Sequence, residues 1–163
     1  MAKSSTGCKD NVMRVALIGY GNTLRGDDAL GPLAVERLRE QLPGPQYVIR
    51  QQLGPELAGL LAECDLAIFV DASVAGAPGE VHVEQLSPEQ ASEMTQNMTH
   101  HVTPVTLLAI SKELYAHAPR TILVTAVGAS FENFEGLSPQ ASRALDEICE
   151  LVPTLIGDFP AMW

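Results

Sequence analysis

Markers of several protein classes are missing from this sequence. Its three cysteines, Cys8, Cys64 and Cys149, are odd in number, widely spaced and without a C-x-x-C pair, so they indicate no disulfide framework and fit a reducing compartment. The polar first residues lack the apolar core of a signal peptide. No apolar run approaches the roughly 18 residues that are needed to cross a bilayer. We therefore expect a cytoplasmic protein without membrane insertion.

Cationic residues are scarce as well. The chain has 10 Lys and Arg against 20 Asp and Glu, a net charge of -10. This charge argues against nucleic acid or an anionic membrane as the main partner and suits a partner that presents a basic segment. With 163 residues, 46% of them hydrophobic, the chain is long enough for one well-buried domain and short for two. We predict a single domain over residues 1–163, with a flexible tail at 1–11, a core at 12–157 and a C-terminal tail at 158–163.

A complete dinucleotide-binding fingerprint is also missing, although residues 15–31 start like one. The sequence V-A-L-I-G-Y-G-N-T-L-R-G-D-D-A-L-G begins as a buried strand and enters a loop at Gly19 and Gly21. These glycines permit backbone angles or close approaches that a side chain forbids. The position of the third glycine of the fingerprint is held by Leu24. A nucleotide-binding α/β protein is therefore the weaker alternative.

Two adjacent acids, Asp27 and Asp28, follow this turn and precede an apolar-periodic segment. Carboxylates would repel a pyrophosphate at the start of a helix, but at the carboxyl end of a sheet they suit a metal site or proton transfer. Asp28 is the candidate functional acid. In a purely structural alternative, Asp27 caps the helix and Asp28 interacts with the helix dipole. The residues alone leave both interpretations open.

Strand and helix patterns alternate along the chain. Strands are expected near residues 14–18, 47–53, 66–70, 81–86 and 121–127, and helices near 29–41, after 54–55, from 103–104 and after 137–139. The run at 66–70 is apolar throughout, which is typical of a central parallel strand buried on both faces. The alternation predicts an α/β fold, a three-layer α/β/α sandwich around a twisted, mostly parallel sheet.

Asp71 follows the central strand, and His100 and His101 stand just before a predicted helix. The carboxyl ends of parallel strands open on one edge of a sheet, so Asp28, Asp71 and a histidine are expected to meet there. Two carboxylates and an imidazole suit a divalent metal site with open positions, or an acid–base pair in which one carboxyl pKa is raised. Taken singly, Asp71 also suits an acceptor for loop amides, and either histidine a cap or a surface residue.

The other chemically active side chains indicate structural roles. His82 alternates within a predicted strand and His117 lies at the end of a predicted helix, so both are expected to be structural. Cys64 and Cys149 fit small core residues. No serine stands in a G-x-S-x-G elbow, which leaves a serine-nucleophile hydrolase with little support.

Three segments resemble the hydrogenase maturation protease family, the nickel–iron hydrogenase processing endopeptidases. They read G-Y-G-N-T-L-R-G-D-D-A-L-G at 19–31, F-V-D-A at 69–72 and H-H-V-T-P at 100–104, and the likeness spans about residues 14–152. The resemblance implies a twisted sheet between helix layers. It also implies a hydrolase that removes the C-terminal extension of the hydrogenase large-subunit precursor after nickel insertion.

Carried over by motif, the family's metal-contacting and catalytic residues fall on Asp28, Asp71 and His101. A shift of one residue would place the histidine on His100, and the resemblance leaves open which of the two is the ligand. Nickel is the implied metal, supplied by the precursor, although another divalent cation fits the same donors. The implied partner is the nickel-loaded precursor. Whether the metal or a carboxylate activates the water is left open, and so is a non-cleaving nickel-checkpoint chaperone that uses the same residues.

Overall fold

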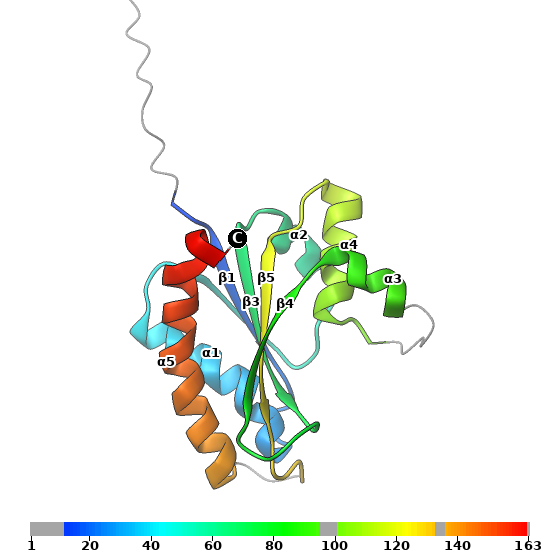
Figure 1. Cartoon of the computed structure of the whole chain (residues 1–163). Coiled ribbons are helices and arrows are strands. Elements are labelled where there is room, and N and C mark those ends of the chain that lie inside the picture. The colour runs from blue at the N-terminus through cyan, green and yellow to red at the C-terminus, as the bar shows by residue number, and fades with distance from the viewer. Residues whose placement is uncertain (1–11, 95–100, 133–135, 163) are drawn as a thin grey trace, which may run out of the picture.

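The computed structural model describes residues 12–94, 101–132 and 136–162. They form a five-stranded sheet in the order β2-β1-β3-β5-β4 (Figure 1). Its strands are β1 (Val15–Tyr20), β2 (Gln46–Arg50), β3 (Leu66–Ser73), β4 (Val81–Leu86) and β5 (Arg120–Val127). The first four in spatial order are parallel, and β4 is antiparallel to β5. The mostly parallel α/β sheet predicted from the sequence is confirmed.

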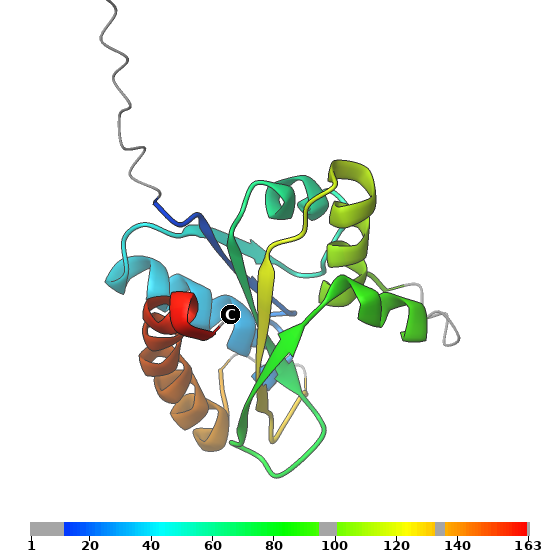
Figure 2. The ribbon, with the colours of Figure 1, turned by 45° about the horizontal axis from the view of Figure 1, so that its top comes forward.

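Helices cover both faces of this sheet and complete the predicted three-layer sandwich (Figures 1 and 2). They are α1 (Leu30–Gln41), α2 (Leu57–Ala62), α3 (Ala91–Met94), α4 (Pro104–Tyr115) and α5 (Pro139–Met162), with 3-10 turns at Gly26–Ala29 and Pro88–Gln90. α1 and α5 pack on one face, and α2 and α4 on the other. Among the described helices, none combines the length and apolar character that a membrane span requires.

Alternate residues of the central strands supply the two halves of the core. Leu17 and Ile68 point toward α1 and α5, whereas Ile18 and Phe69 point toward α2 and α4, and all four are fully buried. Because successive strand residues face opposite sides, a strand covered on both faces must be apolar at every position. This explains the uninterrupted apolar run at 66–70.

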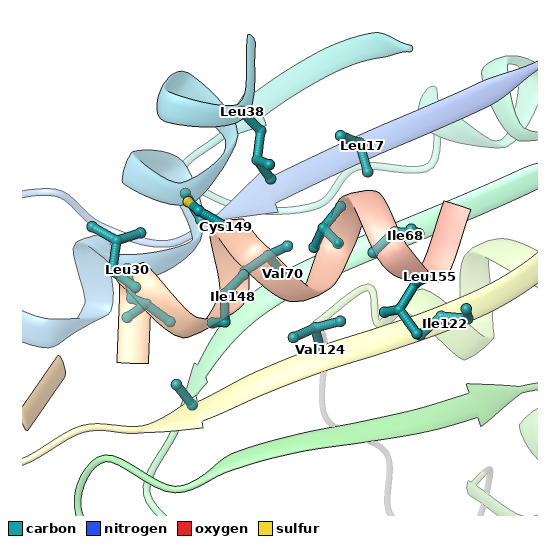
Figure 3. Packing of buried hydrophobic residues seen from close by; sticks show 14 of the residues in the cluster. Leu17, Leu30, Leu38, Ile68, Val70, Ile122, Val124, Ile148, Cys149 and Leu155 are labelled. Atoms are coloured by element: carbon teal, nitrogen blue, oxygen red, sulfur yellow. The ribbon is translucent and has the colours of Figure 1, made fainter. Parts of the chain in front are cut away.

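The C-terminal helix is longer than the sequence predicted. Ile148 and Leu155 lie along the side of α5 that faces the sheet (Figure 3). The apolar stripe continues to Phe159, which packs against the same core. Because this packing holds another turn in place, α5 runs to Met162, and most of the segment 158–163 is helix where a tail was expected.

Strand ends also differ from the prediction. β3 remains paired with β5 as far as Ser73, opposite Val127. Asp71 therefore lies within the hydrogen-bonded strand, opposite Thr125, and not at its end. β2 ends earlier than predicted, at Arg50, and occupies the edge of the sheet. The reason is that pairing, which depends on the neighbouring strand, decides where a strand stops.

Gly31 allows α1 to approach the sheet more closely than a side chain would permit. A Cβ at this position would clash with the backbone oxygens of Val70 and Tyr20. We expect Gly31→Ala to lower the free energy of unfolding by about 1–3 kcal/mol, measured by urea denaturation, because the site would be overpacked.

Gly157→Ala in α5 is the matched control, since a Cβ there would meet no atom within 4 Å. This variant should be neutral or stabilised by up to about 1 kcal/mol, the difference between the helix propensities of glycine and alanine. Equal losses of stability in the two variants would contradict a close approach at Gly31.

Candidate active site

A cleft of about 720 Å³ opens at the carboxyl ends of β1 and β3, and its wall includes Asp28, Asp71 and His101. The structure thus places the three predicted site residues around one cleft, at the sheet edge where open α/β folds bind ligands. Tyr20, the last residue of β1, and Phe131, from the loop after β5, also line it.

Asp28 is held at the cleft by the glycine turn after β1. It lies in the 3-10 turn Gly26–Ala29, and its Oδ2 accepts a hydrogen bond from the backbone N–H of Asn22 at 2.7 Å. Gly21 has a φ of +148°, and a Cβ there would clash with the backbone oxygen of Asp28. The glycine therefore brings the loop against Asp28, which leaves the rest of this half-buried carboxylate facing the cleft.

Asp71 is the site carboxyl whose acidity is most altered. Its pKa is raised to about 6. Burial is the main cause and the neighbouring Asp28 carboxylate adds to the rise, whereas hydrogen bonds from Tyr20 and from the Ala72 backbone, the latter at 2.8 Å, act in the opposite direction. Burial and the same two carboxylates raise the pKa of the Tyr20 phenol, which keeps it protonated as a donor to Asp71. Near neutral pH, Asp71 is thus poised to gain or lose a proton.

His101 reaches the cleft from the loop before α4. Thr103 caps that helix, its Oγ1 accepting from the Thr106 N–H at 3.2 Å, as the T-P dipeptide predicted. The His101 residue is exposed, and His100 lies outside the described residues. Over the described ranges, no three His, Cys, Asp or Glu side chains lie close enough together to hold a metal ion by themselves. The three predicted ligands share a cleft without forming a closed ligand set.

Asp27 is structural, but not in the way that the structural alternative from the sequence supposed. It does not cap α1, whose N-cap residue is Ala29 and makes no side-chain cap hydrogen bond. The fully buried Asp27 carboxylate instead accepts hydrogen bonds from the N–H groups of Ala129, Ser130 and Ser138, at 2.7, 3.1 and 2.7 Å, and from the Ser138 hydroxyl at 2.7 Å.

The same contacts set the acidity of Asp27 and position the loop after β5. Burial acts to raise its pKa, but the hydrogen bonds from Ser138, Ser130 and Ala129 outweigh it and hold the pKa below the ordinary value. The carboxylate therefore stays charged, and it ties the loop that carries Phe131 to the turn that carries Asp28. Of the adjacent acids, one is structural and one faces the cleft.

The four residues expected to be structural lie away from the cleft. A ring nitrogen of His117 makes a 2.8 Å hydrogen bond with the Cys64 carbonyl, and His82 pairs with Glu80 at 3.2 Å on the surface. Cys64 and Cys149 are buried free thiols. None of these four lines the cleft.

Comparisons with known proteins agree in sequence and in fold. No family model matches the chain. The Escherichia coli hydrogenase 2 maturation protease is 28% identical over 146 residues, 86% of this chain and 88% of that protein. The structure of the E. coli hydrogenase maturating endopeptidase HybD superposes with a TM-score of 0.71 at 26% identity, over 90% of this chain and 94% of its own.

An archaeal structure gives the same result. The [NiFe] hydrogenase maturation protease HycI from Thermococcus kodakarensis KOD1 has a TM-score of 0.70 at 27% identity, over 89% of this chain and 93% of its own. These relatives match over nearly the whole of both chains, and the solved structures share the fold of this chain. Over most of its length, the chain is thus similar in sequence and in fold to hydrogenase maturation proteases.

Proposed function

We propose that this protein is the endopeptidase that removes the C-terminal extension of a nickel–iron hydrogenase large-subunit precursor after nickel insertion. Its relatives are named as maturation proteases and endopeptidases. The observation that carries the proposal is the single cleft lined by Asp28, Asp71 and His101. The cytoplasmic location expected from the sequence remains part of this proposal.

In this proposal, nickel enters the cleft as part of the substrate. Two carboxylates and an imidazole suit a borderline divalent cation, yet the described residues do not gather three ligands into a closed site. Such an open set requires further ligands, which the precursor's own thiolates would supply. Asp28, Asp71 and His101 would then recognise the loaded metal, and another divalent cation could occupy the same donors.

Asp71 is the group best suited to move the proton of the attacking water. Its pKa of about 6 lies near the operating pH, which favours a general base. Asp28 is held by the Asn22 amide and supplies charge and metal recognition. A cysteine nucleophile has no support among the described residues, because neither Cys64 nor Cys149 lines the cleft.

The decisive test is intact-mass analysis of nickel-loaded and nickel-free precursor after incubation with the wild-type protein or His101→Ala. Loss of a C-terminal peptide only with nickel and only with His101 intact would support both cleavage and metal recognition. Cleavage without nickel would retain the protease and refute the recognition step. A stable complex with no change in mass would favour the non-cleaving checkpoint chaperone.

The acidity of Asp71 predicts how processing depends on pH. With a pKa raised to about 6, the carboxylate is lost as the pH falls through this value, so kcat/KM should decline about tenfold per pH unit below it. Tyr20→Phe removes a hydrogen bond that lowers this pKa and should move the decline to higher pH. The exposed Tyr115→Phe is the matched control, and a profile that neither variant alters would contradict the role of Tyr20.

A further inference from the structure

Arg25 introduces a cation into a cleft whose other charged groups are acids and a histidine. It lines the cleft with Asp28 and Asp71 and immediately precedes the 3-10 turn that carries Asp28. The N–H of Asp28 donates to the Arg25 carbonyl at 3.1 Å. The backbone at Arg25 is therefore fixed relative to the site, and its exposed side chain starts from the cleft wall.

A second arginine lies where the cleft continues into a side cavity. This side cavity, about 310 Å³, shares Gly21 and Gln51 with the cleft and is lined by Leu24 and Arg50 but by no acidic residue. One N–H of the Arg50 guanidinium donates a hydrogen bond to the Ile49 carbonyl at 2.9 Å. We call the cleft and its adjoining side cavity the groove: the cleft holds both carboxylates and Arg25, and the side cavity holds Arg50.

Both guanidinium groups are free to bind an anion. Within the ranges that the structure describes, neither Arg25 nor Arg50 is ion-paired, and the pairs formed there involve Arg37, His82 and Lys112. Arginine presents a planar set of donors that matches a carboxylate.

We propose that Arg25 and Arg50 bind side-chain carboxylates of the substrate polypeptide and so select an acidic segment beside the scissile bond. The inference rests on the proposed protease function and adds a specificity that it does not require. Leu24, which is 60% exposed at the side cavity, gives the same segment an apolar contact. The net charge of the chain favours a basic partner segment, whereas the two arginines favour an acidic one. The groups that line the groove decide which segment binds there.

The test uses the precursor that the wild-type protein cleaves, with kcat/KM measured by intact mass. Arg25→Gln and Arg50→Gln should each lower kcat/KM about tenfold, mainly through KM, as expected for losing a charge-assisted hydrogen bond. Arg25→Lys should recover part of the loss, because it keeps the charge but not the planar donors. Arg143→Gln, an exposed arginine of α5, is the matched control and should behave as wild type.

Precursor variants identify the source of the carboxylate. Each Asp or Glu near the cut site is changed singly to Asn or Gln, and one of these changes should reproduce the loss seen with Arg25→Gln without adding to it. Arg25→Glu combined with Lys at that precursor position should restore cleavage. In a further precursor, a neutral extension moves the C-terminal carboxylate away from its normal position. If this precursor alone shows the loss of kcat/KM seen with the arginine variants, the side-chain proposal is overturned.

The remaining outcomes separate the two proposals. If the wild-type protein cleaves the precursor and both arginine variants retain its kcat/KM, the acidic-segment inference is refuted while the protease function stands. If the arginine variants are slower but no acidic precursor residue is coupled to them, the inference is also refuted. If the wild-type protein cleaves no precursor, the proposed function itself fails, and this inference with it.

Discussion

Asp71→Asn should reduce processing by about 10²–10⁴-fold, the range for loss of a positioned acid–base group, and should also stabilise the folded protein at neutral pH. Burial raises the pKa of Asp71 from 3.8 to about 6, so the folded state holds the proton more tightly than the unfolded state does. Stability attributable to this group is therefore present at low pH and is lost as the pH rises through that interval. At pH 7 the ionised group is a cost to folding that asparagine removes.

The expected gain in the free energy of unfolding is about 1–3 kcal/mol at pH 7, disappearing below pH 4. It is measured by urea denaturation at several pH values, beside a processing assay with loaded precursor. Asp158→Asn, an exposed acid of α5, is the matched control and should change neither quantity. An Asp71→Asn protein that is inactive and also less stable than wild type at pH 7 would indicate a structural role.

The architecture was predictable because its signals are local. A continuous apolar run identifies a strand buried on both faces, and the run at 66–70 forms the first part of β3, the central strand of the sheet. A threonine followed by proline identifies a helix start, and α4 begins at Pro104. The element boundaries were less predictable, because β3 and α5 extend as far as their partners support them, and those partners lie far away in sequence.

For the site, only its place at the carboxyl ends of the parallel strands was predictable. Parallel strands present their carboxyl ends together, which brought Asp28 and Asp71 to one cleft. Adjacent acids look equivalent in sequence, however, and the burial of Asp27 depends on donors more than 100 residues later along the chain. Arg25 carried no signal at all, since an arginine in a loop usually faces solvent and its position on the cleft wall follows from tertiary structure.

Asp27→Asn should test whether Asp27 stabilises the fold while the adjacent Asp28 acts in the cleft. The Asp27 carboxylate accepts four hydrogen bonds, from Ala129, Ser130 and Ser138, and asparagine would direct an NH₂ group at one set of these donors. Unsatisfied donors and a buried group facing them typically cost about 1–3 kcal/mol each. We expect the free energy of unfolding to fall by about 2–4 kcal/mol, measured by urea denaturation.

The pH dependence of stability gives a second readout. Because hydrogen bonds hold the pKa of Asp27 below 3.8, its contribution is present above that value and is lost as the pH falls through the lowered folded-state pKa. Asp27→Asn should therefore flatten the loss of stability of the wild-type protein in acid. If Asp27→Asn does not fold, Ser138→Ala removes only the hydroxyl contact and should cost about 1–2 kcal/mol.

Asp28→Asn is the matched control for Asp27→Asn, since it makes the same chemical change one residue away. Asp28 accepts a 2.7 Å hydrogen bond from the backbone N–H of Asn22 and otherwise faces the cleft. Its replacement should therefore leave the free energy of unfolding within about 1 kcal/mol of wild type and greatly slow processing. The two variants should thus separate stability from activity. If Asp28→Asn processed loaded precursor at the normal rate, or if Asp27→Asn were as stable as wild type, the assignment of one acid to the fold and the other to the chemistry would be wrong.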